Sequence, residues 1–468
     1  MTLLGAKIAA ARAVGELSRR AGRGGGTSLP GKVLMALEPG AISELAARLP
    51  RGSIVVSATN GKTTTAAMVA SVLGHAGIRV VHNRAGANMA GGVASTLLGA
   101  ARAGGRIDGD LGLFEIDEFW LDRVTLQLEP RGLLLGNLFR DQLDRYGELE
   151  TIADRWAAVT SRASAAGSAA RLVLNADDPL IADLGREAHN VTYFGVEDPS
   201  VAIPEMQHAS DSKHCRRCGA AYVYESIYLG HLGRYRCTSC GQQRPAPAVA
   251  AERIELDGTR RSKFELTTPA GSTTVELPLP GLYNVYNALG AAALCLGLDI
   301  PLQDVAAGLS DVQAAFGRAE RIAIGDVELQ VLLIKNPAGA NEILRTLVLE
   351  HEELDLLAVL NDRTADGRDV SWVWDADFEM LAGRLRRVTC AGTRAAELAV
   401  RLKYAGVPTE RLHVVPGLAP ALDDALAHVD SGHLYALPTY TALLELRREL
   451  AARGHAVRFW EPERVGGR

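Results

Sequence analysis

Apolar runs and amphipathic stretches alternate along the chain from residue 51 onward. Each run has the length and composition of a buried strand, and the stretches between the runs have helical spacing. Strands that alternate with helices indicate a parallel sheet covered by helices. The expected elements of this α/β region are strands at 53–57, 78–83, 110–117, 131–137, 171–179 and 190–195, with a helix at 62–77.

The pattern changes towards the C-terminus. Residues 263–281 alternate as a hairpin does, and the alanine-rich segment 280–298 predicts a buried helix. A second α/β block, Rossmann-like in its alternation, begins near residue 321. Its expected elements are strands at 329–336, 354–362, 387–392, 412–416 and 433–438 and helices at 394–406 and 441–454.

The first 50 residues are expected to be mainly helical. Residues 1–20 interrupt their apolar positions with charges, which favours an amphipathic helix over a signal peptide. The glycine-rich stretch 22–31 predicts a loop, either a mobile linker or a backbone that approaches a ligand. Because no apolar run is long enough to span a bilayer, we expect a cytoplasmic protein without a transmembrane segment.

A chain of 468 residues is too long for one ordinary core. We expect a helical segment at 1–50, a central domain at 51–320 with an inserted module at 206–247, and a C-terminal domain at 321–468. The formal net charge of −5 argues against a general nucleic-acid binder.

Four of the six cysteines form two C-x-x-C pairs inside the inserted module. Cys215 and Cys218 precede Cys237 and Cys240 by a spacing typical of a four-thiolate zinc ribbon. Four thiolates complete a tetrahedron, so we expect structural Zn²⁺, with redox and disulfide roles as alternatives. The remaining two cysteines, Cys295 and Cys390, lie in an apolar helix and a strand, which favours a structural role.

Residues 57–65, SATNGKTTT, follow a buried strand and open a helix, as a phosphate-binding loop does. Gly61, Lys62 and Thr63 match the end of the pattern G-x-x-x-x-G-K-[ST], but Val56 stands where its first glycine is expected. The alternative is a helix N-terminus with a chance Gly-Lys-Thr.

A functional loop would use its backbone and two side chains. The N–H groups from Asn60 to Thr64 would face phosphates, Lys62 would neutralise them, and Thr63 would bind Mg²⁺. Glu115 ends a predicted strand, where a carboxylate can reach the same metal.

Five motifs in this order resemble the Mur ligase family. After the loop come FEIDE, the segment NLFRDQLDRYG that begins at residue 137, LNADDP, GLYNVYNALGAA and FGRAERI. The resemblance implies an ATP-dependent ligase that forms an acyl phosphate and then an amide. By position it places Glu115 on Mg²⁺, Asn287 near adenine and Arg318 near the phosphates. Gln142 stands where the family has a metal-binding histidine, so whether Gln142 binds metal stays open.

An inserted zinc ribbon resembles one branch of the family, the MurT subunits of lipid II isoglutaminyl synthase. The resemblance implies amidation of the α-carboxylate of D-isoglutamate in the lipid II stem peptide. It also implies that the protein acts on this substrate at the inner face of the membrane. The ammonia would come from a GatD-like class I glutaminase on another chain. The alternatives are a stand-alone Mur-type amino-acid ligase and a nucleic-acid binder with a vestigial loop.

The resemblance also implies a carboxylate of this chain that completes the partner's catalytic triad. The segment after the strand at 354–362 offers Asp362, Asp366, Asp369 and Asp375. A carboxylate there could orient an imidazole across an interface, and we choose Asp369.

Overall fold

The computed structural model describes most of the chain. The described residues are 3–20, 28–83, 87–102, 106–141, 149–165, 168, 170–208, 210–313 and 318–456.

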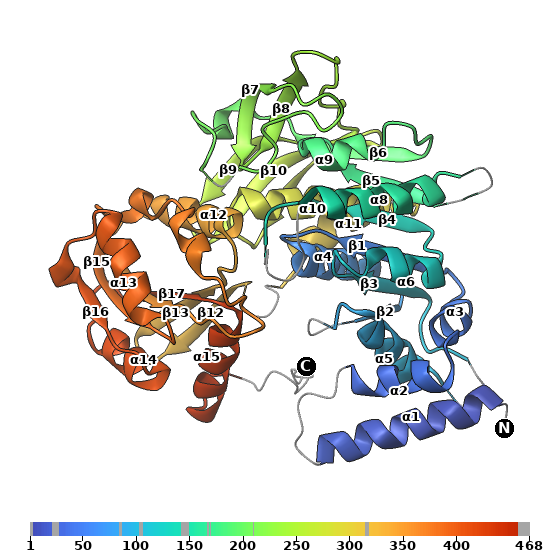
Figure 1. The fold of residues 1–468 in the computed structure, drawn as a ribbon, viewed down its shortest axis with the longest axis horizontal. Coiled ribbons are helices and arrows are strands. Elements are labelled where there is room, and N and C mark those ends of the chain that lie inside the picture. The colour runs from blue at the N-terminus through green and yellow to red at the C-terminus, as the bar shows by residue number, and fades with distance from the viewer. Residues whose placement is uncertain are drawn as a thin grey trace.

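A nine-stranded sheet organises the first two thirds of the molecule, in the order β11-β10-β9-β6-β5-β4-β1-β3-β2 (Figure 1). Neighbours from β2 to β9 pair in parallel, and β9, β10 and β11 form an antiparallel edge. Its strands are β1 (Ser53–Ser57), β2 (Val80–His82), β3 (Leu111–Glu115), β4 (Gly132–Leu135), β5 (Arg171–Asn175), β6 (Val191–Val196), β9 (Val249–Asp257), β10 (Arg261–Thr268) and β11 (Gly271–Leu277).

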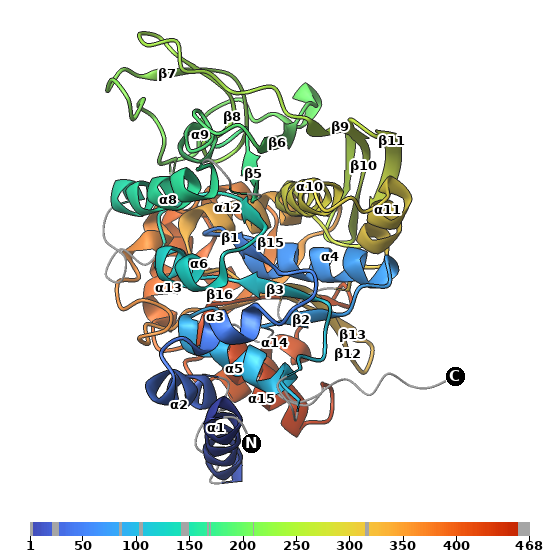
Figure 2. The ribbon, with the colours of Figure 1, turned by 90° about the vertical axis from the view of Figure 1, so that its right-hand side faces the viewer.

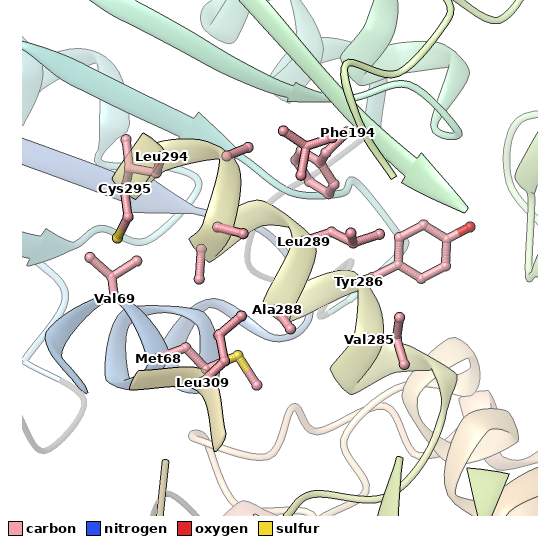
Figure 3. Close-up of a cluster of buried hydrophobic side chains, with 14 of the residues drawn as sticks. Met68, Val69, Phe194, Val285, Tyr286, Ala288, Leu289, Leu294, Cys295 and Leu309 are labelled. Carbon is pink, nitrogen blue, oxygen red and sulfur yellow. The ribbon is translucent and has the colours of Figure 1, made fainter. Parts of the chain in front are cut away.

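Helices cover this sheet because its central strands are apolar on both faces, as the wholly buried β1 and β3 illustrate. Figure 3 shows Val69 of α4 beside Cys295 of α10 and Met68 of α4 beside Leu309, while Leu289 of α10 points the other way, towards Phe194. The helices of this part are α1 (Leu3–Arg20), α2 (Leu29–Leu37), α3 (Ala41–Ala46), α4 (Lys62–His75), α5 (Ala90–Ala100), α6 (Leu121–Leu128), α8 (Leu149–Ala163), α9 (Pro179–Asp183), α10 (Leu282–Leu296) and α11 (Leu302–Ser310), with a 3-10 turn η1 (Pro199–Val201).

The last third forms a six-stranded sheet in the order β12-β13-β17-β14-β15-β16. Only β12 runs antiparallel to its neighbour. The strands are β12 (Arg318–Ile324), β13 (Val327–Leu332), β14 (Leu354–Val359), β15 (Leu385–Ala391), β16 (Leu412–Val414) and β17 (His433–Pro438). The helices are α12 (Pro337–Val348), α13 (Ala395–Tyr404), α14 (Leu418–Ala427) and α15 (Tyr440–Ala452), with 3-10 turns η2 (Ser371–Trp374), η3 (Phe378–Leu381) and η4 (Thr409–Arg411).

A small two-stranded antiparallel sheet stands apart from both large sheets. It consists of β7 (Tyr222–Leu229) and β8 (Leu232–Cys237), which follow β6 and precede β9 in the chain. Figure 2 shows it projecting from the top of the molecule. We call residues 206–247 the cysteine module.

The α/β architecture with parallel sheets and the amphipathic N-terminal helix are confirmed. The loop expected at 22–31 is wrong at its end, because Leu29 and Pro30 open α2. Proline at the start of a helix loses no helical hydrogen bond, so Pro30 begins the helix here. Residues 22–27 lie outside the described residues. Within the described part of the chain, no helix is long and apolar enough to cross a membrane.

Candidate functional site

The phosphate-loop sequence lies between β1 and α4, at the carboxyl end of β1, which pairs with β4 and β3. Gly61 caps α4 with a φ of 85°, a left-handed conformation that favours glycine. A Cβ atom at this position would collide with Oδ1 of Asn287 in α10. The loop therefore requires glycine for its backbone conformation and for the close approach of Asn287.

The segment after β4 fixes the shape of this loop. The N–H of Asn60 donates to Oδ1 of Asn137 at 2.9 Å, and Nδ2 of Asn137 donates back to the carbonyl of Asn60 at 2.9 Å. The N–H of Thr59 donates to the carbonyl of Asn137 at 3.0 Å. The N–H of Asn60, which the sequence analysis expected to face phosphate, is therefore engaged by Asn137, and the N–H groups at the start of α4 are the ones placed to bind an anion.

Lys62 is buried against acidic groups at the first turn of α4. Its Nζ donates to Oε2 of Glu118 at 3.0 Å and to the carbonyl of Ala58 at 3.0 Å. Burial by itself would lower the pKa of Lys62, but the carboxylates of Glu118, Asp117 and Glu115 outweigh it and raise the pKa. Lys62 is therefore a permanent cation at the loop.

Glu115 lies where the sequence predicted it, at the end of β3 beside the loop strand. Val56 of β1 pairs with Glu115 in the parallel register. Asn83, just after β2, receives the N–H of Glu115 and donates to its carbonyl, each at 2.8 Å. Buried carboxylates of Glu115, Asp117 and Glu118 thus gather beside Lys62. Such oxygen ligands suit Mg²⁺.

Glu118 is a site residue that the sequence analysis missed. It belongs to the FEIDE motif, in which the sequence analysis assigned only Glu115 to the metal, yet Glu118 is the carboxylate bonded to Lys62. A lysine in a phosphate loop and a carboxylate three residues beyond a strand end are weak signals separately. Only the parallel pairing of β1 with β3 brings them together.

The predicted adenine-side residue, Asn287, is held within the first turns of α10. Its Oδ1 accepts from the hydroxyl of Thr65 at 3.2 Å, and its Nδ2 donates to Asn284 at 3.1 Å. Asn287 lines a pocket together with Asn60, Gly61 and Thr64 of the loop region. Its other lining residues are Asn137, Phe139, Leu229, Leu232, Tyr283, Tyr286, Ala319, Leu332, Leu333, Lys335, Ala338, Gly339, Glu342 and Ile343.

The C-terminal sheet contributes a second group of residues that the sequence analysis missed. Lys335, after β13, donates to the carbonyl of Thr59 at 3.1 Å and to Asp141 at 2.7 Å. Asn336 caps α12 and exchanges amide hydrogen bonds with Asn60. Because these contacts join positions 194 or 276 residues apart, no local pattern could have indicated them.

Two residues of the sequence prediction have no described side-chain environment. Arg318 begins β12, where its backbone pairs with Leu332, and its side chain lies outside the described part of the structure. Gln142 lies outside the described residues altogether. Thr63, the predicted magnesium ligand, is half-buried in the first turn of α4.

The four paired cysteines of the cysteine module converge. Their Sγ atoms all lie within 4.8 Å of one another. Cys215 Sγ lies 3.5 Å from Cys240 Sγ, and Cys218 Sγ lies 3.4 Å from Cys237 Sγ, so each close pair joins two different C-x-x-C motifs. Both distances exceed a disulfide bond, and the arrangement suits a tetrahedral metal ion.

The four candidate aspartates have different environments. Asp362 forms an ion pair with Arg394. Asp366 is buried, and its carboxylate accepts hydrogen bonds from the N–H and the hydroxyl of Thr441. Asp375 lies 3.8 Å from Arg140.

Asp369 is exposed and lies two residues before the turn η2. One of its oxygens accepts the N–H of Ser371 at 2.8 Å, and hydrogen bonding by Ser371 lowers the pKa of Asp369. It is therefore an anionic carboxylate at the surface.

Two family profiles match separate segments of the chain. The family described as Mur ligase middle domain matches residues 56–235, and the family described as MurT ligase C-terminal matches residues 333–443. The first includes the phosphate loop and the second includes Asp369.

Solved structures share the fold. A pseudomurein peptide ligase type C from Methanothermus fervidus has a TM-score of 0.65 at 24% identity, covering 86% of this chain and 79% of its own. A MurF ligase from Thermotoga maritima in complex with ADP has a TM-score of 0.60 at 14% identity, covering 91% of this chain and 85% of its own. At these identities the likeness concerns the fold alone.

Sequence relatives extend over nearly the whole chain. The MurT subunit of lipid II isoglutaminyl synthase (glutamine-hydrolyzing) from Streptococcus pneumoniae is 33% identical over 92% of this chain and 93% of its own. The corresponding subunit from Staphylococcus aureus strain N315 is 30% identical over 93% of this chain and 96% of its own. The predicted resemblance is confirmed, and the chain belongs to the MurT family of Mur ligases.

Proposed function

We propose that this chain is the ligase subunit of a glutamine-hydrolysing lipid II isoglutaminyl synthase in peptidoglycan synthesis. The observation that carries the proposal is the match to MurT subunits over more than nine tenths of the chain. The reaction is ATP-dependent amidation of the α-carboxylate of D-isoglutamate in the lipid II stem peptide. The end-to-end match favours this reaction over that of a stand-alone amino-acid ligase.

The phosphate loop supplies the charge neutralisation that this chemistry needs. ATP and Mg²⁺ would be held by N–H groups from Gly61 to Thr64, by Lys62 and Thr63, and by Glu115, while the N–H of Asn60 stays bonded to Asn137. Phosphoryl transfer to the substrate carboxylate gives an acyl phosphate, and ammonia then displaces phosphate to form the amide. Positioning and electrostatic stabilisation dominate such a reaction, so a buried cation at the loop supports it.

Arg318 and Asn287 complete the proposed nucleotide contacts. Asn287 lines the pocket beside Gly61, which supports a place near adenine. For Arg318, close to the phosphates, the support is its position at the start of β12, next to the pocket residue Ala319.

The ammonia comes from a GatD-like glutaminase on another chain. Glutaminases of that class use a reactive cysteine, and the two unpaired cysteines described here are buried. Burial raises the pKa of Cys390 to about 12 and raises that of Cys295 further, so neither is a thiolate at neutral pH.

Asp369 is the residue we propose to orient the partner's catalytic histidine. Exposed aromatic surface lies close to it in sequence. Trp374 of η2 is 52% exposed, and its ring centroid lies 5.9 Å from that of Tyr404, which is 73% exposed, with the two rings tilted. Exposed aromatic side chains near an exposed carboxylate suit a protein interface. The chain would reach its substrate lipid II by associating peripherally with the inner membrane surface.

The cysteine module holds a structural Zn²⁺ in this proposal. Four convergent sulfurs leave no open coordination position, so the ion would stabilise the module without taking part in the reaction.

A mass-spectrometric assay tests the proposed function. The chain is incubated with ATP, Mg²⁺, a lipid II analogue and ammonium, and the product should have the mass of the amide in place of the acid. Adding glutamine in place of ammonium should give product only when a GatD-like glutaminase is present. Failure of both reactions would overturn the proposal, and incorporation of an amino acid would favour the stand-alone ligase.

A further inference from the structure

The face that α1 turns away from the protein is apolar. The buried positions of α1 recur every three or four residues and are Leu4, Ile8, Ala11 and Gly15. The exposed positions whose side chains the structure describes are Ala6, Ala9, Ala10, Arg12, Ala13, Val14 and Leu17. A helix at a protein surface normally turns charged side chains to water, yet Arg12 is the single charged residue among these exposed positions. The outer face of α1 therefore has the composition of a face that another apolar surface covers.

Larger apolar side chains extend this face onto the neighbouring helices. Those exposed on α1, on α2 and directly before α5 are Val14, Leu17, Leu29, Leu37 and Met89. Leu17 is the most exposed of them, at 66%. Helix α2 packs against both α1 and α5, and Gly15 of α1 lies directly against Pro30 of α2. These side chains therefore lie on adjoining helices at one end of the molecule, the lower end in Figures 1 and 2.

The same end of the molecule is basic. The basic residues of α1 and α2 are Lys7, Arg12, Arg19, Arg20 and Lys32, and the one acidic residue in these two helices is Glu16. Glu38, directly after α2, pairs with Lys7 at 2.7 Å. Five basic against two acidic side chains leave a net charge of +3, although the whole chain carries −5. Positive charge is thus concentrated where the exposed surface is apolar.

An anionic lipid bilayer matches both properties of this end. Helices that lie in a membrane interface bury an apolar face at the boundary of the acyl chains and place lysine and arginine among the headgroups. Each basic side chain near an anionic leaflet strengthens such binding. Figure 1 shows α1 lying lengthwise along the outer edge of the molecule, so a flat bilayer can meet it along its whole length. A partner protein would instead need a groove that fits a protruding helix.

We propose that α1 and α2 dock this protein on an anionic phospholipid bilayer. Val14, Leu17 and Leu29 enter the interface, and Lys32, which is exposed on α2, lies at the headgroups. The proposal rests on the proposed function in one respect, namely that a lipid-linked substrate is reached at a bilayer surface. It goes beyond that function by naming the surface that makes the contact.

Vesicle co-sedimentation of the full-length chain tests this docking surface without substrate or nucleotide. The probes are vesicles of phosphatidylglycerol mixed with phosphatidylcholine and vesicles of phosphatidylcholine alone. The wild type should bind the anionic vesicles at least about tenfold more tightly, and added salt should weaken that binding. Leu17→Glu should lower the affinity for anionic vesicles by about tenfold or more, because it places a charge where an apolar side chain enters the interface.

Two matched controls separate the surface from a general effect of added negative charge. Leu126→Glu changes an exposed leucine of α6, outside the proposed surface, and should bind vesicles as the wild type does. Lys32→Glu should weaken binding to anionic vesicles by about fivefold or more. Lys403→Glu, at an exposed lysine of α13, should leave that binding unchanged.

Amidation with ammonium distinguishes this inference from the proposed function. Leu17→Glu should amidate a water-soluble lipid II analogue at the wild-type rate, and lipid II in anionic vesicles at least about fivefold more slowly. If Leu17→Glu also loses the soluble reaction, the comparison of Lys32→Glu with Lys403→Glu decides. Vesicle binding without amidation of either substrate overturns the proposed function alone.

Three results would overturn the docking surface. The first is a wild type that does not bind anionic vesicles. The second is equal vesicle binding by the wild type, Leu17→Glu and Lys32→Glu. The third is unchanged vesicle binding in Leu17→Glu together with loss of self-association or of glutaminase binding, which would assign this face to a protein.

Discussion

Lys62 has two roles. It forms a buried ion pair that contributes to stability, and it lies in the phosphate loop, where we propose that it binds nucleotide. Its ammonium contacts Glu118 at 3.0 Å, and both side chains are at least nine tenths buried. Removing one partner of such a pair leaves an uncompensated buried charge, which is more damaging than removing both.

Lys62→Ala should therefore lose both nucleotide binding and stability. We expect the free energy of unfolding to fall by about 3 kcal/mol or more, because Glu118 loses its counter-ion. The double variant Lys62→Ala/Glu118→Gln should recover most of that stability but no ADP binding. Chemical denaturation and calorimetry measure the two effects. Recovery of ADP binding in the double variant would contradict a phosphate-binding role for Lys62.

At the scale of elements, the cysteine module is built on a short hairpin. We expect the strands of this hairpin to be held in place by a metal at the end that carries the cysteines. The strands β7 and β8 carry the cysteine pairs at one end and Leu229 and Leu232 at the other, where the hairpin lines the pocket. Two strands alone are marginally stable in water. A metal at the cysteine end would therefore also order the pocket end.

Cys218→Ser should remove the zinc and weaken nucleotide binding. We expect about one zinc per wild-type chain by elemental analysis and none in the variant, with Tm lowered by roughly 5 °C or more. ADP affinity should fall as well, since Leu229 and Leu232 lose their support. Cys390→Ala is the matched control and should retain the metal, because Cys390 lies in the core of the other sheet. A wild-type chain without zinc would contradict the structural-metal proposal.

At the scale of the whole molecule, the nucleotide pocket belongs to neither sheet alone. The loop and α10 supply one wall and the segment from β13 into α12 supplies another. Lys335 joins the two by its bonds to Thr59 and Asp141. The catalytic arrangement therefore depends on how the two sheets are docked.

Lys335→Ala should impair catalysis more than stability. Its amino group is half-buried, and partly exposed ion pairs contribute little to folding. Loss of the bridge should reduce kcat for ammonia-dependent amidation by roughly tenfold or more, because misplaced reacting groups cost rate steeply. Small-angle X-ray scattering should show a larger radius of gyration with ADP bound. Lys403→Ala, exposed on α13, is the control. Equal rates in both variants would contradict the bridging role.

Asp369 belongs to the same scale, since its proposed role is completed by another chain. In the complex with a GatD-like glutaminase, Asp369→Asn should reduce glutamine-dependent amidation by about 10³-fold or more while ammonium-dependent amidation persists. The matched control is Asp375→Asn. Asp375 directly follows η2 and lies 3.8 Å from Arg140, and this variant should retain both activities. If Asp375→Asn loses the glutamine reaction and Asp369→Asn keeps it, the assignment is wrong.

The sequence by itself determined the elements and their local chemistry. Periodicity predicted the strands around Ser57 and Glu115 and the buried helix that holds Asn287. The buried positions of a strand or helix must be apolar, so the spacing of apolar residues in the sequence indicates the element. The ordered motifs indicated the family, and the spacing of the C-x-x-C pairs indicated the cluster whose sulfurs the structure brings together.

Only the tertiary structure decided which distant groups meet. The partner of Lys62 proved to be Glu118, and the loop is bonded by Lys335 and Asn336 from the other sheet. The pocket's carboxylate, Glu342, lies in a helix whose pattern indicates only an amphipathic face. Such pairings follow from strand order and domain docking. Neither leaves a periodic trace in the chain, because the paired groups lie 56 to 276 residues apart.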